Sequence, residues 1–203
     1  MKIILHLCAD IGSDSYPYQL DPEYEVIKIG KEIGVENYSP DKKIHGVIAN
    51  PVCTDFSFAK VKWEQDIEKG LFLVKECERI IKECNPVFWA IENPATGRLK
   101  DYLGKPDFIY HPWQFGSPWT KKTALWGKFN RPIKRFSKWE QVEQNGNLYK
   151  RPGRNKPNFA FLHKSAINHI PEFEPFKDFV DTDNAFRSLS SQGFARAFKE
   201  VNK

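Results

Sequence analysis

A cysteine and a carboxyl side chain each follow a predicted buried strand, and this pair is where the sequence could do chemistry. Cys53 stands on a proline-containing turn just after the run His45–Ala49, and Glu92 directly follows the apolar run Val87–Ile91. Short apolar and β-branched runs bounded by turn residues are typical of buried strands. Because open α/β sheets bind ligands at the carboxyl ends of their strands, we expect both side chains at one crevice.

The chemistry expected of Cys53 is that of a nucleophile. A turn that opens a helix favours the thiolate form of a cysteine. A cysteine protease would need histidine and asparagine or aspartate partners, and none of the five histidines has a recognisable protease context. A carboxylic acid such as Glu92 suggests another pairing, in which the thiolate adds to a ring carbon while the acid protonates a ring nitrogen.

The elements that must position this pair read as alternating strands and helices. Strands are expected over Lys2–Cys8, Tyr24–Ile29, His45–Ala49, Val87–Ile91 and within 117–127. Apolar residues at three- and four-residue intervals predict a helix over Lys62–Cys84, and one last helix is expected over Phe186–Val201. Residues 98–116 are expected to form loops. This order predicts an α/β fold with a mostly parallel sheet, right-handed crossovers and helices on both faces.

The length and amino-acid composition of the chain suit one compact domain. The chain has 203 residues, of which 40% are apolar and 28% charged, as in ordinary globular proteins. The four cysteines form no C-x-x-C pair and no zinc-ligand spacing, and neither a signal peptide nor a membrane span is evident. We therefore expect a cytoplasmic monomer with reduced thiols and no metal.

A basic segment between Lys128 and Lys156 contains only Glu140 and Glu143 as acids, and aromatic residues are interleaved with its lysines and arginines. Phosphate neutralisation with nearby stacking is what a nucleic-acid surface needs. The net charge of +5 agrees with such a partner. A solvated basic loop remains the alternative. The loop Ala9–Ser15 reads either as a backbone cradle for a cofactor or as an ordinary turn that opens a helix.

Four motifs in order along the chain resemble those of the DNA cytosine-5 methyltransferases. Asn50–Ser57 resembles their Pro-Cys motif, Ile91–Pro94 their Glu-Asn-Val motif, and Phe115–Thr123 their Phe-Gly-x-Pro-Gln-x-Arg-x-Arg segment. The loop Leu7–Ser15 occupies the place of the S-adenosylmethionine loop, and short phage and prophage members are an especially close match. The resemblance implies a Rossmann-like S-adenosylmethionine-dependent methyltransferase fold, DNA as partner, and the cytoplasm of a bacterium or a phage-infected host.

The resemblance also implies a role for each matching residue. Cys53 would attack C6 of a flipped cytosine, Glu92 would bind N3 and the 4-amino group, and Lys121 would contact the base. S-adenosylmethionine, which leaves as S-adenosylhomocysteine, would be held by Cys8, Ala9, Asp10, Ile11, Gly12, Ser13, Glu32, Asn50, Pro51 and Ser191. DNA would be bound by Asn93, Pro94, Thr123, Arg131, Lys134, Arg135, Arg151 and Arg154.

The chain departs from the family pattern at several positions. Val52 replaces the proline before the cysteine, Asp10 lies where the first glycine of the cofactor loop is usual, and Trp119 replaces the glutamine. Gly30 stands where an acid usually takes the ribose hydroxyls, and Glu32 follows two residues later.

The expected division of the chain is a catalytic core over 1–127, a short target-recognition-like segment over 128–185, and a terminal helix over 186–203 that packs back on the core. Three other functions stay open. The stretch Asn50–Val52 also resembles the motif of amino-methyltransferases that act on exocyclic amines. The altered cofactor loop suits a non-catalytic nucleic-acid-binding relative, and a related enzyme could attach some other group to position 5 of pyrimidines.

Overall fold

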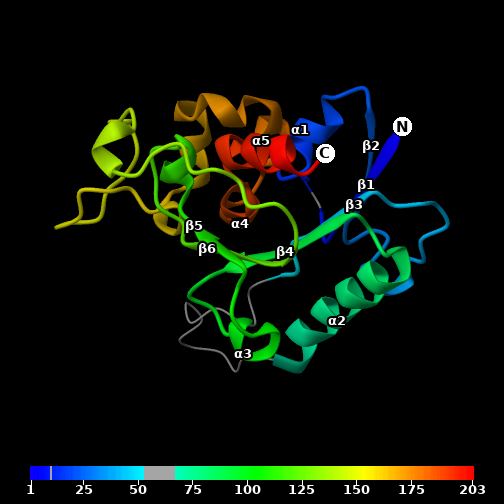
Figure 1. Cartoon of the computed structure of the whole chain (residues 1–203). Helices are drawn as coiled ribbons and strands as arrows, with labels where there is room; N and C mark the ends of the chain where they lie inside the picture. Colours follow the sequence, from blue (N-terminus) through cyan, green and yellow to red (C-terminus); the bar gives the residue numbers. More distant parts are fainter. Residues whose placement is uncertain (10, 53–66) are drawn as a thin grey trace.

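The computed structural model describes residues 1–9, 11–52 and 67–203, which form a central sheet with helices on both faces (Figure 1). Within these residues the sheet has six strands in the order β2-β1-β3-β4-β6-β5. The strands are β1 (Lys2–Leu7), β2 (Tyr24–Ile29), β3 (Gly46–Ala49), β4 (Phe88–Pro94), β5 (Phe108–Tyr110) and β6 (Thr123–Lys128).

The first four strands run parallel, because β1 pairs with β2 and β3, and β3 pairs with β4, in parallel register. Strand β6 runs antiparallel to both β4 and β5. The predicted α/β class with a mostly parallel sheet is therefore confirmed. Residues 98–116, which are expected to be rich in loops, also contain β5 and the short helix α3 (Lys100–Leu103). Strand β5 has only three residues and lies at the sheet edge, between Pro106 and Pro112, so it leaves little apolar pattern in the sequence.

Helix α2 (Ile67–Cys84) covers one face of the sheet, on the side opposite to α1, α4 and α5 in Figure 1. Its buried residues Val74, Cys77 and Ile81 belong to one apolar cluster with Leu5 and Val47 of the sheet. The predicted helix is confirmed over 67–84, and its expected first residues, 62–66, lie outside the described part. Helix α2 therefore packs against β1 and β3 on one face of the sheet, and the carboxyl ends of these parallel strands lie at one edge of the sheet.

The opposite face is covered by α1 (Tyr16–Gln19) and α5 (Gln192–Val201). Phe194 of α5 stacks on Tyr110 with ring centroids 3.9 Å apart, and Phe198 lies edge-on to Phe88. Aromatic contacts of this kind add to simple area burial. They hold the last helix against the sheet beside β4 and β5.

A third cluster holds the segment that follows β6. Trp119 is 1% exposed and packs among Phe159, Phe173 and Phe186, so this departure from the family pattern serves the core. The regular structure of this segment begins with four stretches of 3₁₀ helix, η4 (Trp139–Gln141), η5 (Phe159–Phe161), η6 (Lys164–His169) and η7 (Pro171–Phe179). Two other stretches of 3₁₀ helix, η1 (Val35–Asn37) and η3 (Pro112–Phe115), lie earlier in the chain.

The prediction of one helix over Phe186–Val201 is wrong, because two helices meet at a break. Helix α4 (Asp183–Ser188) ends at Leu189, whose backbone is extended with ψ 137°, and α5 begins after Ser191. The Ser191 hydroxyl accepts a hydrogen bond from the backbone N–H of Phe194, a typical N-cap. The break leaves Ser190 and Ser191 buried, and Ser190 bonds Ser13 and Asp14 of the loop after β1.

Candidate active site

Asn50 and Glu92 lie side by side where β3 and β4 end. Ala49 is paired with Ile91 in the parallel ladder, so the residues that follow them are brought together. The Asn50 side chain donates from Nδ2 to Glu92 Oε2 across 3.0 Å. The prediction that these strand ends are neighbours is confirmed. Cys53, the expected nucleophile, lies outside the described residues, three positions after Asn50 in the sequence.

A buried histidine that the sequence did not single out orients this pair. His6 Nε2 lies 2.6 Å from Asn50 Oδ1, and His6 Nδ1 lies 2.8 Å from Ser15 Oγ. A neutral ring protonated on Nε2 satisfies both contacts, because Oδ1 accepts and the serine hydroxyl donates. Burial lowers the pKa of His6 to about 4, so the neutral ring is the form present near pH 7. The amide of Asn50 is thereby fixed with its NH₂ group toward Glu92.

The acidity of Glu92 is set by its surroundings. Burial raises its pKa above the usual range and the charge of Asp14 adds to this effect, while Lys121 and the Asn50 hydrogen bond oppose it. Asp14 is itself buried, which raises its own pKa, and it accepts a hydrogen bond of 2.5 Å from Ser190 Oγ. Both carboxyls line a cavity of about 10 Å³, space for about one water molecule. This environment favours a protonated acid at the end of β4.

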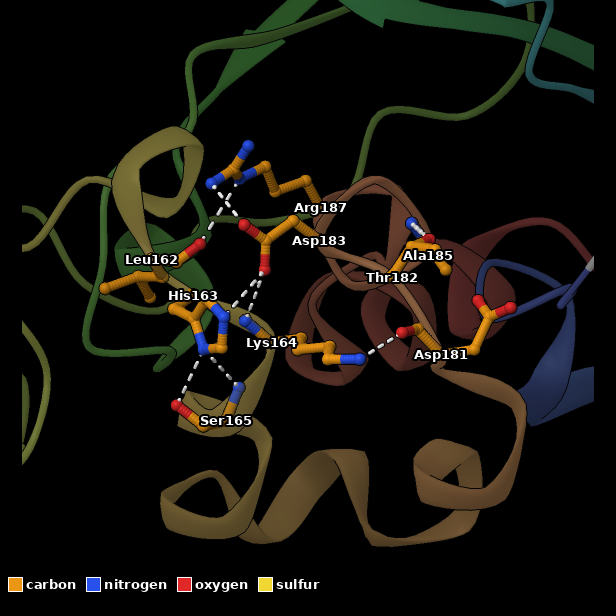
Figure 2. A network of polar contacts seen from close by, with 9 residues as sticks. All are labelled: Leu162, His163, Lys164, Ser165, Asp181, Thr182, Asp183, Ala185 and Arg187. Carbon is orange, nitrogen blue, oxygen red and sulfur yellow. Dashed lines mark hydrogen bonds and ion pairs between the residues drawn. The ribbon is translucent and has the colours of Figure 1, made fainter.

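Lys121 is held by backbone carbonyls of the segment at the end of α4. Its Nζ donates to the carbonyl oxygens of Arg187 at 3.1 Å and Leu189 at 3.4 Å. Figure 2 shows how α4 is fixed: the Arg187 side chain bonds Asp183 and the Leu162 carbonyl, and Asp183 also accepts from the Lys164 N–H. The Lys121 charge is therefore presented to Glu92 from a rigid support.

Two residues expected to contact DNA instead support the site from within. Asn93 is 1% exposed and donates from Nδ2 to the Pro51 carbonyl across 2.9 Å, which ties β4 to the turn after β3. Thr123 is also 1% exposed, and its hydroxyl donates to the Lys121 carbonyl across 3.2 Å. Pro94, the last residue of β4, is half-buried.

The loop after β1 fits a backbone cradle in part. Cys8 and Gly12 have left-handed φ angles of 55° and 79°, so the chain turns sharply at the carboxyl end of β1. Residues with a side chain rarely adopt a φ of 79°, so glycine is favoured at position 12, where an added Cβ would also meet the flexible Lys28 side chain. Ala9 and Ser13 are buried, Ile11 is half-buried, and Asp10 lies outside the described residues.

The two remaining expected cofactor contacts are placed differently. Glu32 is exposed just beyond β2. Ser191 is 3% exposed, and its hydroxyl lies 2.6 Å from Ser117 Oγ while it caps α5. The Ser191 side chain is thus engaged in joining α5 to the segment before β6.

All five basic residues expected to bind DNA are exposed, but they do not form one group. Arg151 and Arg154 line a separate cavity of about 290 Å³. Lys134 donates from Nζ to the Ile109 carbonyl across 3.0 Å at the β5 edge, and the Arg135 backbone N–H bonds the Gln114 carbonyl. Arg131 is exposed a few residues after β6.

The described residues contain neither a metal-ligand cluster nor a membrane-spanning helix. No group of three or more histidine, cysteine, aspartate or glutamate side chains suited to a metal ion occurs in the part of the chain that the structure describes. No helix in the same residues is long and apolar enough to cross a membrane.

Comparison with known proteins gives one match in sequence. The chain is 32% identical over 98 residues to a protein of Frog virus 3 (isolate Goorha) named as a probable DNA (cytosine-5)-methyltransferase. The chain is similar to a DNA (cytosine-5)-methyltransferase. The match covers 39% of this chain and 44% of the relative, so the chain spans less than half of that protein's length. No protein-family model matches the chain.

A solved structure of a candidate DNA modification methyltransferase encoded within a prophage (E. coli) is also similar, with a TM-score of 0.45 and 14% identity. It covers 63% of this chain, which covers 47% of that chain. The sequence resemblance to DNA methyltransferases is confirmed by the viral relative, and the description of the fold rests on the sheet order itself.

Proposed function

We propose that this protein is a DNA cytosine-5 methyltransferase that transfers the methyl group of S-adenosylmethionine to C5 of cytosine. The observation that carries the proposal is the half-buried Glu92 carboxyl, whose pKa is raised by desolvation and which Asn50 holds where β3 and β4 end. The similarity to the viral relative supports the same chemistry. The protein would act in the cytoplasm of a bacterium or of a phage-infected host.

The proposed reaction uses the residues of the site in turn. The Cys53 thiolate forms a bond to C6 of a flipped cytosine, while Glu92 gives its proton to N3 and becomes a carboxylate. S-adenosylmethionine would supply the methyl group that C5 takes up, and would leave as S-adenosylhomocysteine. A base then removes the proton from C5, the C6–S bond breaks to release the Cys53 thiolate, and N3 returns its proton to the Glu92 carboxylate. Lys121 would stabilise the Glu92 carboxylate after proton transfer.

S-adenosylmethionine supplies an electrophilic methyl group when it is bound. The residues that would hold it are those of the loop after β1, with Gly12 at its sharp turn, and Asn50 and Pro51 after β3. Exposed Glu32 would accept hydrogen bonds from the ribose hydroxyls. Ser191 would act indirectly, by fixing α5 against Ser117.

The arrangement of Asn50 does not favour transfer to an exocyclic amine. An amino-methyltransferase of the type considered above uses an asparagine side chain to hold the substrate NH₂ group. Here Asn50 Oδ1 already accepts from His6, and Nδ2 already donates to Glu92. The cytosine-5 reaction needs only that this amide hold Glu92 in place.

The proposal is tested with DNA that carries 5-fluorocytosine. Fluorine cannot leave C5 as a cation, so the enzyme and DNA stay joined as a covalent adduct that denaturing gels detect. We expect an adduct that requires S-adenosylmethionine and is absent from Cys53→Ser. Absence of an adduct with every duplex and single strand tried would contradict the proposal.

A further inference from the structure

A cavity of about 290 Å³ lies outside the Glu92 site, on the segment that follows β6. It is near the lower end of the size range of small-ligand pockets. Thr120 is one of its lining residues, and its backbone N–H donates to the Pro157 carbonyl while its carbonyl accepts from Phe159, both across 2.9 Å. The Thr120 hydroxyl donates to the same Pro157 carbonyl across 3.0 Å. Three hydrogen bonds thus hold this residue in place.

The charged residues that line this cavity are all basic. Arg151, Arg154 and Lys156 line it, and none of the lining residues that the structure describes is acidic. Lys156 Nζ lies over the ring of Trp139, 5.3 Å from its centroid, which holds this side chain at the wall. Three cations around one small hollow favour an anionic ligand such as a phosphate group.

The same cavity exposes aromatic rings, whereas most other aromatics of this segment are buried. Tyr149 is 57% exposed and Phe161 is 47% exposed, and both line the cavity. The Arg151 guanidinium lies over the Phe161 ring, 4.5 Å from its centroid. Aromatic rings and guanidinium planes are the surfaces on which an unstacked base lies in proteins that bind single strands.

The position of the cavity relates it to the Glu92 site. Thr120, which lines the cavity, is followed directly by Lys121, whose charge acts on Glu92. Consecutive Cα atoms are about 3.8 Å apart, so the two sites are joined by one stretch of backbone.

We propose that this cavity binds one unstacked nucleotide of a single-stranded stretch of DNA next to the target base, a proposal that rests on the DNA-modifying function above. The base stacks on Tyr149 and the Arg151 plane, and Arg154 and Lys156 bind the flanking phosphates. Bases inside an intact duplex are stacked on one another and cannot enter a hollow of this size. The substrate preferred by this protein is therefore single-stranded or locally opened DNA.

The test is fluorescence anisotropy with three probes: a labelled oligothymidylate, a duplex of equal length, and free thymidine monophosphate as competitor. Oligothymidylate contains no cytosine, so its binding does not depend on whether the protein methylates. We expect the single strand to bind more tightly than the duplex, and the free nucleotide to compete weakly. A duplex or a free nucleotide that binds as tightly as the single strand would overturn the proposal.

Substitutions locate the binding. Tyr149→Ala should weaken oligothymidylate binding roughly 5- to 150-fold, the range found for stacking on one base, and Tyr149→Phe should restore it. Arg154→Gln should reduce the salt dependence of binding. The matched control is Phe179→Ala, because Phe179 is 67% exposed and does not line the cavity. If Tyr149→Ala binds like this control, the cavity is not the nucleotide site, whatever the methyl-transfer assay shows.

Discussion

The side-chain amide of Asn50 donates to Glu92 Oε2 across 3.0 Å, at the point where β3 and β4 end side by side. Within the described residues, no hydrogen bond to the second carboxyl oxygen of Glu92 is found, and we expect this oxygen to meet the substrate. The contact also links the acid to the strand end that precedes Cys53 by three positions in the sequence.

Glu92→Gln should lower the rate of adduct formation on 5-fluorocytosine DNA by about 10²- to 10⁴-fold. Glutamine can still accept from Asn50, but it has no proton to give to N3. Rapid-quench gel analysis measures the rate. The matched control is Glu172→Gln, since Glu172 is another carboxyl with a pKa raised by burial, placed against Ser117. Equal losses in the two variants would show that the effect is structural.

Asp14→Asn should move the alkaline limb of the pH–rate profile toward lower pH. The reaction needs protonated Glu92, so the rate falls as pH rises through the pKa of that group. The Asp14 charge raises this pKa, and its removal lowers it. Asparagine can still accept from Ser190 Oγ, which keeps the loop in place. The other titratable groups near Glu92 are Lys121, Tyr110 and the neutral His6. An alkaline limb that moves to higher pH would contradict the effect of the Asp14 charge on the pKa of Glu92.

His6→Gln should reduce the amount by which the free energy of unfolding falls between pH 7 and pH 4. The pKa of His6 is about 4 in the folded protein, below its usual value of 6.5, because of burial with a smaller contribution from Lys28, against the Asn50 hydrogen bond. The unfolded chain therefore binds the proton first, and wild-type stability falls as pH drops from 6.5 to 4, by about 3 kcal/mol. Urea unfolding of both proteins at pH 7 and pH 4 measures the difference. Parallel losses in the two proteins would refute a buried neutral His6.

Gly193→Ala should destabilise the protein by about 1–3 kcal/mol, because an added Cβ would lie 2.2 Å from the Phe115 carbonyl oxygen. This close approach is what seats α5 beside η3. Gly146→Ala is the control, since nothing lies within 4 Å of a Cβ at that position. We expect the control to change the free energy of unfolding by less than about 0.5 kcal/mol. Thermal unfolding of the two variants compares them, and equal melting temperatures would contradict this packing of α5.

The sequence predicts the central sheet well because its strands are short, mostly apolar runs bounded by turn residues. Lys2–Leu7, Tyr24–Ile29 and Gly46–Ala49 are found where the pattern places them. The edge strand β5 was missed because three residues beside prolines carry no period. The break between α4 and α5 is hidden in the sequence because Ala185 and Leu189 before it, and Phe194 and Phe198 after it, each keep a four-residue spacing. The serines between the two pairs cap α5 and turn the chain.

The site is predictable only where local motifs mark it. Glu92, Asn50 and Lys121 stand in recognisable stretches, and the structure brings Asn50 and Glu92 together. His6 carries a signal that was available, a polar residue inside a central apolar strand. Asp14 and Ser190 are 176 positions apart and meet only because the terminal segment folds back, so no local pattern could reveal their contact.

Mass spectrometry of nucleosides tests the central claim most directly. Single-stranded and duplex DNA are incubated with the protein and S-adenosylmethionine that carries an isotopically labelled methyl group, then digested. The proposed function predicts labelled 5-methyldeoxycytidine that is absent with Cys53→Ser. Labelled N4-methyldeoxycytidine or N6-methyldeoxyadenosine, or no labelled nucleoside from either form of DNA, would contradict it.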